Sequence, residues 1–185
     1  ARTITYWWRQ DGADTAEGAS ISFGDNAGSG TRFDVKEATA AADLRVEVQG
    51  TGQNTNPTNF DDGNWHFVAV TVPDAATFTD VAWYVDGSFT DLNTSGSTLD
   101  IATGAGPLVF GDSILDFNDN RTPNGFIDDF QLYDEVLTQD QIQSLFHNPG
   151  STIGGEVPEP ASIVLWAIIG IGLFGFSRLR LRRKR

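Results

Sequence analysis

The segment that decides the fold, residues 125–138, reads Gly-Phe-Ile-Asp-Asp-Phe-Gln-Leu-Tyr-Asp-Glu-Val-Leu-Thr. Side chains alternate between the two faces of a strand, so this segment predicts a strand with Phe126, Asp128, Phe130 and Leu132 on its core-facing row. An ionised carboxylate on a buried row is costly unless it is hydrogen-bonded, paired with a cation or bound to a metal. Asp128 therefore indicates either a carboxylate held by N–H groups or an arginine, or a metal site.

The rest of the chain is typical of one all-β domain. Its 185 residues, 39% of them hydrophobic, suffice for a single folded domain of roughly 150 residues. Helical periodicity is nearly absent, and turn residues recur about every ten positions, which predicts a two-sheet antiparallel jelly-roll sandwich. We expect strands near residues 3–10, 19–23, 31–35, 44–49, 64–72, 81–86, 88–90 and 107–111, with a polar loop over 50–63.

Two local signals sharpen this prediction. Asp86-Gly87 is a two-residue hairpin turn that should pair the strands on either side of it. Thr138 and Gln141 form a capping box, after which Ile142, Leu145 and Phe146 give one apolar face to a short capping helix that ends at residues 148–150.

The charge excludes one class of partner. The net charge is −13, and the body without the six cations of residues 178–185 carries −19. A surface this acidic repels phosphate backbones, so we expect no nucleic acid partner and favour divalent cations. The chain has no cysteine, which rules out a disulfide, a thiolate nucleophile and a sulfur-ligated metal.

Trp7 is the candidate ligand-binding residue. It shares a strand face with Thr3, Thr5 and Arg9, and an aromatic side chain on a half-polar face either stacks on a sugar ring or packs against a neighbouring element. His66 lies on one face with Val68, without a second histidine or a nucleophile nearby in sequence, and we interpret it as a hydrogen-bonded structural residue.

The loop over residues 112–124 is rich in oxygen donors, among them Asp116, Asn118 and Asp119. Calcium takes six to eight oxygen ligands in tolerant geometry, so these residues are candidate calcium ligands together with Asp128. The spacing does not match an EF-hand, and a solvated loop is the alternative interpretation.

The C-terminal part of the chain has a different character. Residues 150–160 read as a linker, residues 161–177 as an apolar transmembrane helix, and residues 178–185 as a cytoplasmic basic tail. By the positive-inside rule, the acidic domain over residues 1–149 lies outside the cytoplasm. The chain contains no methionine, so we expect that it is processed or truncated at its start.

Five segments together resemble a bacterial laminin-G-like domain of the concanavalin A-like superfamily: residues 3–7 with Trp7, residues 65–70, 84–87, 108–111 and 125–137. The resemblance implies a jelly roll that binds glycans or proteins, often with calcium held near the paired acidic residues of the last strand, Asp128 and Asp129. It also implies one or two strands before residue 3, so we expect either that the chain is a fragment or that a sheet edge is open for another strand.

The tail resembles the PEP-CTERM sorting signal of Gram-negative bacteria. The resemblance is carried by a proline-rich motif, the apolar run and the basic cluster, namely Val157, Pro158, Glu159, Pro160, Arg178, Arg180, Arg182 and Arg183. It implies recognition by an exosortase in the inner membrane, removal of the tail, and delivery to the cell surface or an extracellular polysaccharide matrix.

We therefore expect a non-catalytic surface or matrix protein whose sandwich binds carbohydrate, a polysaccharide or matrix glycan, with calcium. The alternative is a structural matrix or filament subunit that self-associates through an open edge. A glycoside hydrolase is disfavoured because the closely spaced Glu-x-Asp-x-x-Glu strand of laminarinase-type enzymes is absent. In addition, adjacent residues of a regular strand place Asp128 and Asp129 on opposite faces, which cannot form a catalytic pair.

Overall fold

The computed structural model describes residues 1–11, 18–38, 43–48, 51–54, 62–90, 99–114 and 122–154. Almost all of them belong to one compact unit, Ala1–Thr152. The predicted transmembrane helix and basic tail lie outside the described residues. Among the residues that are described, no helix has the length and apolar character needed to cross a membrane.

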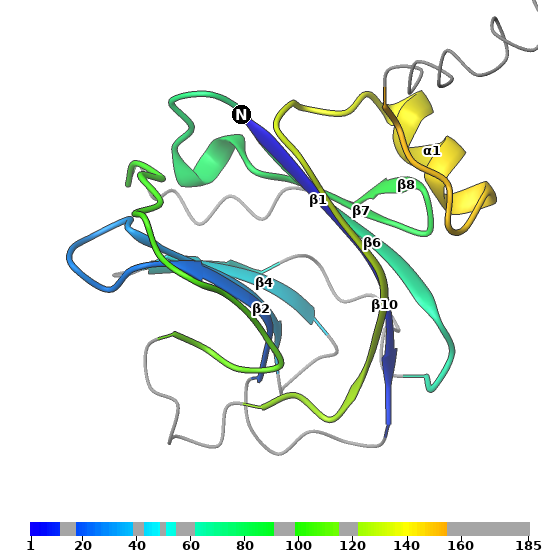
Figure 1. Ribbon diagram of the computed structural model, residues 1–185, viewed down its shortest axis with the longest axis horizontal. Coiled ribbons are helices and arrows are strands. Elements are labelled where there is room, and N and C mark those ends of the chain that lie inside the picture. The colour runs from blue at the N-terminus through cyan, green and yellow to red at the C-terminus, as the bar shows by residue number, and fades with distance from the viewer. Residues whose placement is uncertain are drawn as a thin grey trace, which may run out of the picture. The chain divides into compact units, whose positions relative to one another are not determined.

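The described residues contain ten strands, which form two antiparallel five-stranded sheets. Figure 1 shows the two layers. Sheet A has the order β10 (Gly125–Tyr133), β1 (Arg2–Gln10), β6 (His66–Val72), β7 (Ala82–Val85) and β8 (Ser88–Thr90). Sheet B has the order β5 (Thr51–Asn54), β4 (Asp43–Val48), β3 (Arg32–Ala38), β2 (Gly18–Gly24) and β9 (Leu108–Phe110). The short helices are η1 (Phe78–Asp80) and α1 (Gln139–His147). The predicted all-β sandwich with one short C-terminal helix is confirmed.

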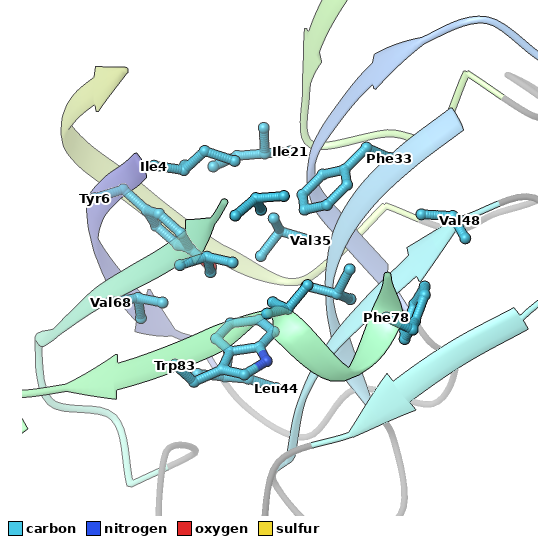
Figure 2. Packing of buried hydrophobic residues seen from close by; sticks show 14 of the residues in the cluster. Ile4, Tyr6, Ile21, Phe33, Val35, Leu44, Val48, Val68, Phe78 and Trp83 are labelled. Carbon is cyan, nitrogen blue, oxygen red and sulfur yellow. The ribbon is translucent and has the colours of Figure 1, made fainter. Parts of the chain in front are cut away.

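The apolar side chains of the two sheets meet in one core. Ile4, Tyr6 and Trp8 of β1 point inward at every second position and are buried together with Ile21 and Phe33 of sheet B. Figure 2 shows Ile4, Tyr6, Ile21 and Phe33 gathered between the layers. Burial of such a set of large apolar side chains is the main stabilising contribution, about 1.5–3 kcal/mol for each.

Two turn and loop expectations have different outcomes. The hairpin at Asp86-Gly87 is confirmed, because both residues have positive φ, 49° and 73°, and Val85 pairs with Ser88. The expectation of an uninterrupted loop over residues 50–63 is wrong, since Thr51–Asn54 pairs with β4. Its polar composition resembles a loop, but an edge strand needs only one bonded neighbour and few apolar side chains.

Strand β10 is irregular, and this corrects the face predicted for Asp128. Thr5 of β1 lies opposite Gln131, whereas Trp7 lies opposite Asp128, so β10 has one more residue than β1 between these pairs. The extra residue forms a β-bulge in which Asp129 has a φ of 47°. As a consequence Ile127 packs against the core and Asp128 is exposed.

Only one member of the predicted core-facing row keeps its place. Phe130 packs against the core, but Phe126 is 45% exposed and Leu132 is 53% exposed. The prediction assumed strict alternation, but the residue inserted at the bulge places Phe126 and Asp128 on the face opposite to Phe130. Leu132 lies opposite Ile4 of β1 and is exposed near the end of β10. Asp128 consequently needs no buried partner.

Helix α1 begins at the predicted capping box. Thr138 Oγ1 accepts a hydrogen bond from the N–H of Gln141, and the Gln141 side chain accepts one from the N–H of Thr138. Ile142 and Leu145 are buried, and Phe146 lies over the outer face of sheet A. In Figure 1, α1 lies beside β8.

The outer face of sheet B holds a buried group of charges. Lys36 is fully buried, with its Nζ 3.1 Å from Glu47 Oε2 and 3.7 Å from Asp34 Oδ2, and Arg32 Nε lies 3.0 Å from the same Asp34 oxygen. Burial raises the pKa of Asp34, although the hydrogen bond from Ser22 and the charges of Arg32 and Lys36 oppose this. The charged residues of β3 alternate with core residues, a pattern typical of a solvated face, so the cluster has no sequence signal of its own.

Candidate functional site

A pocket of about 550 Å³ lies on the outer face of sheet A. It is lined by Trp7, Trp65, Asp128, Asp129, Pro149 and Gly150. The sheet register explains why these residues meet. Trp7 pairs with Asp128 across β1 and β10, and it pairs with Phe67 across β1 and β6, two residues beyond Trp65. Three predicted site residues, Trp7, Asp128 and Asp129, are thus brought together.

Trp7 both packs and lines the pocket. Its indole stacks on Phe146 of α1 at 5.8 Å between ring centroids and meets Phe67 edge-on at 5.5 Å. These contacts hold the half-buried ring in one orientation. Trp7 therefore packs against a neighbouring element, which was one of its two interpretations. Because the ring also borders the pocket, the two interpretations of Trp7 do not exclude each other.

Asp129 has a structural role at the pocket wall. Its Oδ2 accepts a hydrogen bond from the N–H of Gly150 at 2.7 Å, and its Oδ1 accepts one from Gln131 Nε2 at 2.8 Å. Both carboxylate oxygens are therefore engaged, and they fix the turn after α1 against β10. This turn contributes Pro149 and Gly150 to the pocket.

Asp128 differs from its neighbour. One oxygen accepts the N–H of Asp129 at 2.8 Å, and within the described part of the chain the carboxylate has no cationic partner. The two aspartates line the same pocket, so the expectation that they point to opposite faces is wrong. The bulge at Asp129 is the reason, because it breaks the alternation on which that expectation rested.

An aromatic surface extends beyond the pocket. The guanidinium of Arg9 lies between the rings of Trp65 and Phe126, with Cζ 5.2 Å and 4.6 Å from their centroids. Trp65 is 40% exposed and Phe126 is 45% exposed. Trp65 falls within the strand predicted over residues 64–72 and was not among the predicted site residues. Its position one residue before β6, next to the turn at Gly63, is the signal that could have revealed it.

His66 is hydrogen-bonded, as expected. Its Nδ1 lies 2.9 Å from Asp86 Oδ2, and its Nε2 lies 3.1 Å from Asp62 Oδ1. Partial burial lowers the pKa of His66, but the hydrogen bonds to Asp86 and Asp62 outweigh burial, so that its pKa is raised. Hydrogen bonds from Asn64 and from His66 lower the pKa of Asp62 to about 2. This group secures the start of β6 next to Trp65.

The proposed calcium ligands are only partly described. Asp116, Asn118 and Asp119 lie outside the described residues. Among those that are described, no three His, Cys, Asp or Glu side chains lie close enough together to hold a metal ion. The pocket supplies two carboxylates, and both oxygens of Asp129 already accept hydrogen bonds. Calcium therefore remains a prediction that depends on Asp116, Asn118 and Asp119, outside the described residues.

Comparisons with known proteins agree with this architecture. Residues 1–143 match the family described as the concanavalin A-like lectin/glucanases superfamily, a laminin-G type, and residues 156–184 match the PEP-CTERM protein-sorting motif. Over 104 residues, the chain is 35% identical to a curated relative from Rattus norvegicus. That relative is the sushi, von Willebrand factor type A, EGF and pentraxin domain-containing protein 1. This match covers 53% of the chain and 3% of the length of the relative.

Solved structures with the same fold include two proteins linked to sialic acid. The CBM40 of a Ruminococcus gnavus IT-sialidase, bound to alpha2,3 sialyllactose, has a TM-score of 0.57 at 16% identity, covering 78% of this chain and 82% of that one. The sialidase of Trypanosoma rangeli has a TM-score of 0.56 at 15% identity, covering 78% of this chain and 22% of that one.

The sandwich, its strand order and the extent of the match lead to one identification. The chain belongs to the concanavalin A-like lectin/glucanases superfamily, with a laminin-G-like domain, and carries a C-terminal PEP-CTERM sorting signal that implies export and surface sorting.

Proposed function

We propose that this protein is a non-catalytic, exported surface or matrix protein whose sandwich binds carbohydrate in the pocket between Trp7 and Trp65. The observation that carries the proposal is the pocket itself, where two indoles and two carboxylates meet in about 550 Å³. This volume is within the range of about 300–1,000 Å³ that is typical of small-molecule sites.

The chemistry of the lining suits a sugar. Indoles present flat apolar surfaces to the C–H faces of a pyranose ring, and carboxylates accept hydrogen bonds from its hydroxyl groups. The CBM40 that shares the fold was solved with an oligosaccharide, which supports a glycan as the ligand. Pre-set side chains also favour binding, since Trp7 is held by Phe146 and Asp129 by the N–H of Gly150.

The sorting signal supplies the second half of the proposal. An exosortase would recognise the motif at residues 157–160, while residues 161–177 hold the chain in the inner membrane and the basic tail stays in the cytoplasm. The acidic domain would then reach the cell surface or the extracellular matrix. An extracellular polysaccharide matrix would present glycans to such a pocket.

Isothermal titration of the protein against neutral, acidic and amino-sugar oligosaccharides tests the proposal, with alpha2,3 sialyllactose as one acidic probe. Trp65→Ala should weaken binding of any positive ligand about tenfold or more, because it removes one aromatic wall. Phe89→Ala is the matched control, since Phe89 is 51% exposed on β8 and does not line the pocket.

The titration is repeated with added calcium and with EDTA, because the calcium prediction requires that EDTA weakens binding. Absence of heat with every glycan would remove the carbohydrate proposal. Release of new reducing ends during incubation would contradict a non-catalytic function.

A second function, self-assembly, is favoured by the open side of the sandwich. Among the described strands, β10 ends sheet A and β9 ends sheet B. Phe110 and Leu132 on these two strands are 48% and 53% exposed. Exposed apolar edge strands pair readily with a second copy of the chain. Sedimentation velocity at micromolar protein should show oligomers that Phe110→Ser disrupts, and a strictly monomeric protein would exclude this function.

A further inference from the structure

We propose that the pocket selects glycans that carry a free amino group, with the ammonium paired to Asp128. This inference rests on the proposed carbohydrate function and names the class of sugar. It begins from the difference between the two aspartates of the pocket. Asp129 accepts two hydrogen bonds from the protein, whereas Asp128 accepts one local N–H and is exposed on the pocket side of β10.

The pocket has the charge and the lining that an ammonium requires. Its only described titratable side chains are Asp128 and Asp129, and both are carboxylates. Trp7 and Trp65 also line the pocket, and the face of each indole ring that Phe146 or Arg9 does not cover attracts cations electrostatically. A carboxylate beside aromatic walls thus provides both a charged hydrogen-bond acceptor and a surface for cation–π contact.

The cationic side chains near the site do not neutralise Asp128, so the pocket can still attract an ammonium group. Arg9 lies on β1 two residues after Trp7, but its guanidinium is held between Trp65 and Phe126. Across the strands Arg9 pairs with Phe126 rather than with Asp128. No described ion pair joins Arg9 to Asp128. His147, at the end of α1, contacts Phe146 and does not line the pocket.

The electrostatic field of the whole protein also favours a cationic ligand. The net charge of −13 concentrates cations near the surface and repels anionic sugars. Long-range attraction alone would act on any cationic glycan at any acidic patch. Selectivity for the amine must therefore come from the contact with Asp128. The experiment has to separate this contact from the long-range electrostatic attraction of the acidic protein.

Two probes with one backbone make this separation possible: a chitosan oligosaccharide and its fully N-acetylated counterpart. The protein is titrated with each at about pH 5.5, in EDTA and moderate salt, so that the amine is protonated and no divalent cation competes for Asp128. The expected result is binding of the chitosan oligosaccharide about tenfold tighter than its acetylated counterpart.

Asp128→Asn and Asp140→Asn form the matched pair of variants. Each removes one negative charge, but Asp140 is exposed in the first turn of α1, at the opposite end of the helix from Pro149. Asp128→Asn should abolish the preference for the amine, and Asp140→Asn should retain it. The preference of the wild type should also fade at about pH 8.5, where the sugar amine is largely neutral.

Each outcome decides a different question. Equal binding of the two probes, or an equal loss of preference in both variants, overturns the pairing at Asp128. If neutral glycans bind in a Trp65-dependent way while the amine confers no gain, the amine inference fails and the proposed function stands. If no glycan of any class binds, both fail.

Discussion

At the scale of the residue, Asp128 and Asp129 show how neighbours in sequence can have different roles. The left-handed backbone at Asp129, with a φ of 47°, turns its carboxylate toward Gly150 and leaves Asp128 facing the pocket. Aspartate tolerates this conformation better than most residues. The sequence identified both residues as site candidates, but the bulge that separates their roles depends on the register with β1, which no local pattern reveals.

This division of roles predicts different effects of two substitutions. Asp129→Ala removes the hydrogen bonds from Gly150 and Gln131 and places alanine at a positive φ, so it should lower the free energy of unfolding by about 1–3 kcal/mol. Asp128→Ala should change it by about 0.5 kcal/mol or less, since that side chain is exposed. Urea denaturation of both variants measures the contrast, and equal losses would contradict it.

His66 gives a pH dependence with a definite sign. Its pKa is raised in the folded state, so its stabilising contribution is complete below its ordinary value of 6.5 and is lost as the pH rises through the raised pKa. The difference in unfolding free energy between the wild type and His66→Gln should therefore be larger at about pH 5.5 than at about pH 8.5.

Denaturant titrations at the two pH values test this dependence. His147→Gln is the control, because His147 is exposed at the end of α1. A difference between the wild type and His66→Gln that grows toward high pH would show that the bonds to Asp86 and Asp62 do not stabilise the imidazolium.

At the scale of the element, α1 and the β7–β8 hairpin together support the pocket. Phe146 of α1 stacks on Trp7, and the side chain of Gln139 donates a hydrogen bond to the carbonyl of Gly87 in the hairpin turn. The capping box and the Asp86-Gly87 turn were readable in the sequence because each is set by neighbours within four residues. Their contact with each other is tertiary, and it therefore had no sequence signal.

A substitution at Gly87 tests the contact between α1 and the β7–β8 hairpin. Gly87 has a φ of +73°, and a Cβ there would lie 3.0 Å from Phe146 Cδ1. Gly87→Ala should lower the unfolding free energy by about 2–3 kcal/mol, of which about 1 kcal/mol comes from the backbone. Gly63→Ala is the matched control, with a φ of +79° and no atom within 4 Å. Equal losses in the two variants would show that Phe146 does not press on the hairpin.

At the scale of the whole molecule, the sequence predicted the architecture better than the surfaces. Alternation and turn chemistry were enough for the two-sheet sandwich, since Ile4, Tyr6 and Trp8 occupy the core as their spacing indicates. The buried charges of β3 were missed because Arg32, Asp34 and Lys36 alternate with Phe33 and Val35 in the pattern of a solvated face. Burial of that outer face depends on segments distant in the chain, such as Ser113.

The buried charges should be costly to break. Lys36→Met removes the contacts of Lys36 to Glu47 at 3.1 Å and to Asp34 at 3.7 Å, but Arg32 and Arg45 still pair with these carboxylates. It should therefore lower the unfolding free energy by about 1–3 kcal/mol. Arg45→Gln removes a contact to the same carboxylate at 3.2 Å, but Arg45 is 24% exposed, so the loss should be at most about 1 kcal/mol. Thermal unfolding of both variants measures the difference, and a Lys36→Met protein as stable as the wild type would contradict it.

The central claim, that the pocket between Trp7 and Trp65 is the carbohydrate site, is tested most directly by nuclear magnetic resonance of the indole N–H groups during titration with a glycan. We expect the signals of Trp7 and Trp65 to shift with increasing ligand, while those of the buried core residues Trp8 and Trp83 stay in place. Saturable binding that leaves Trp7 and Trp65 unchanged would place the site elsewhere and contradict the claim.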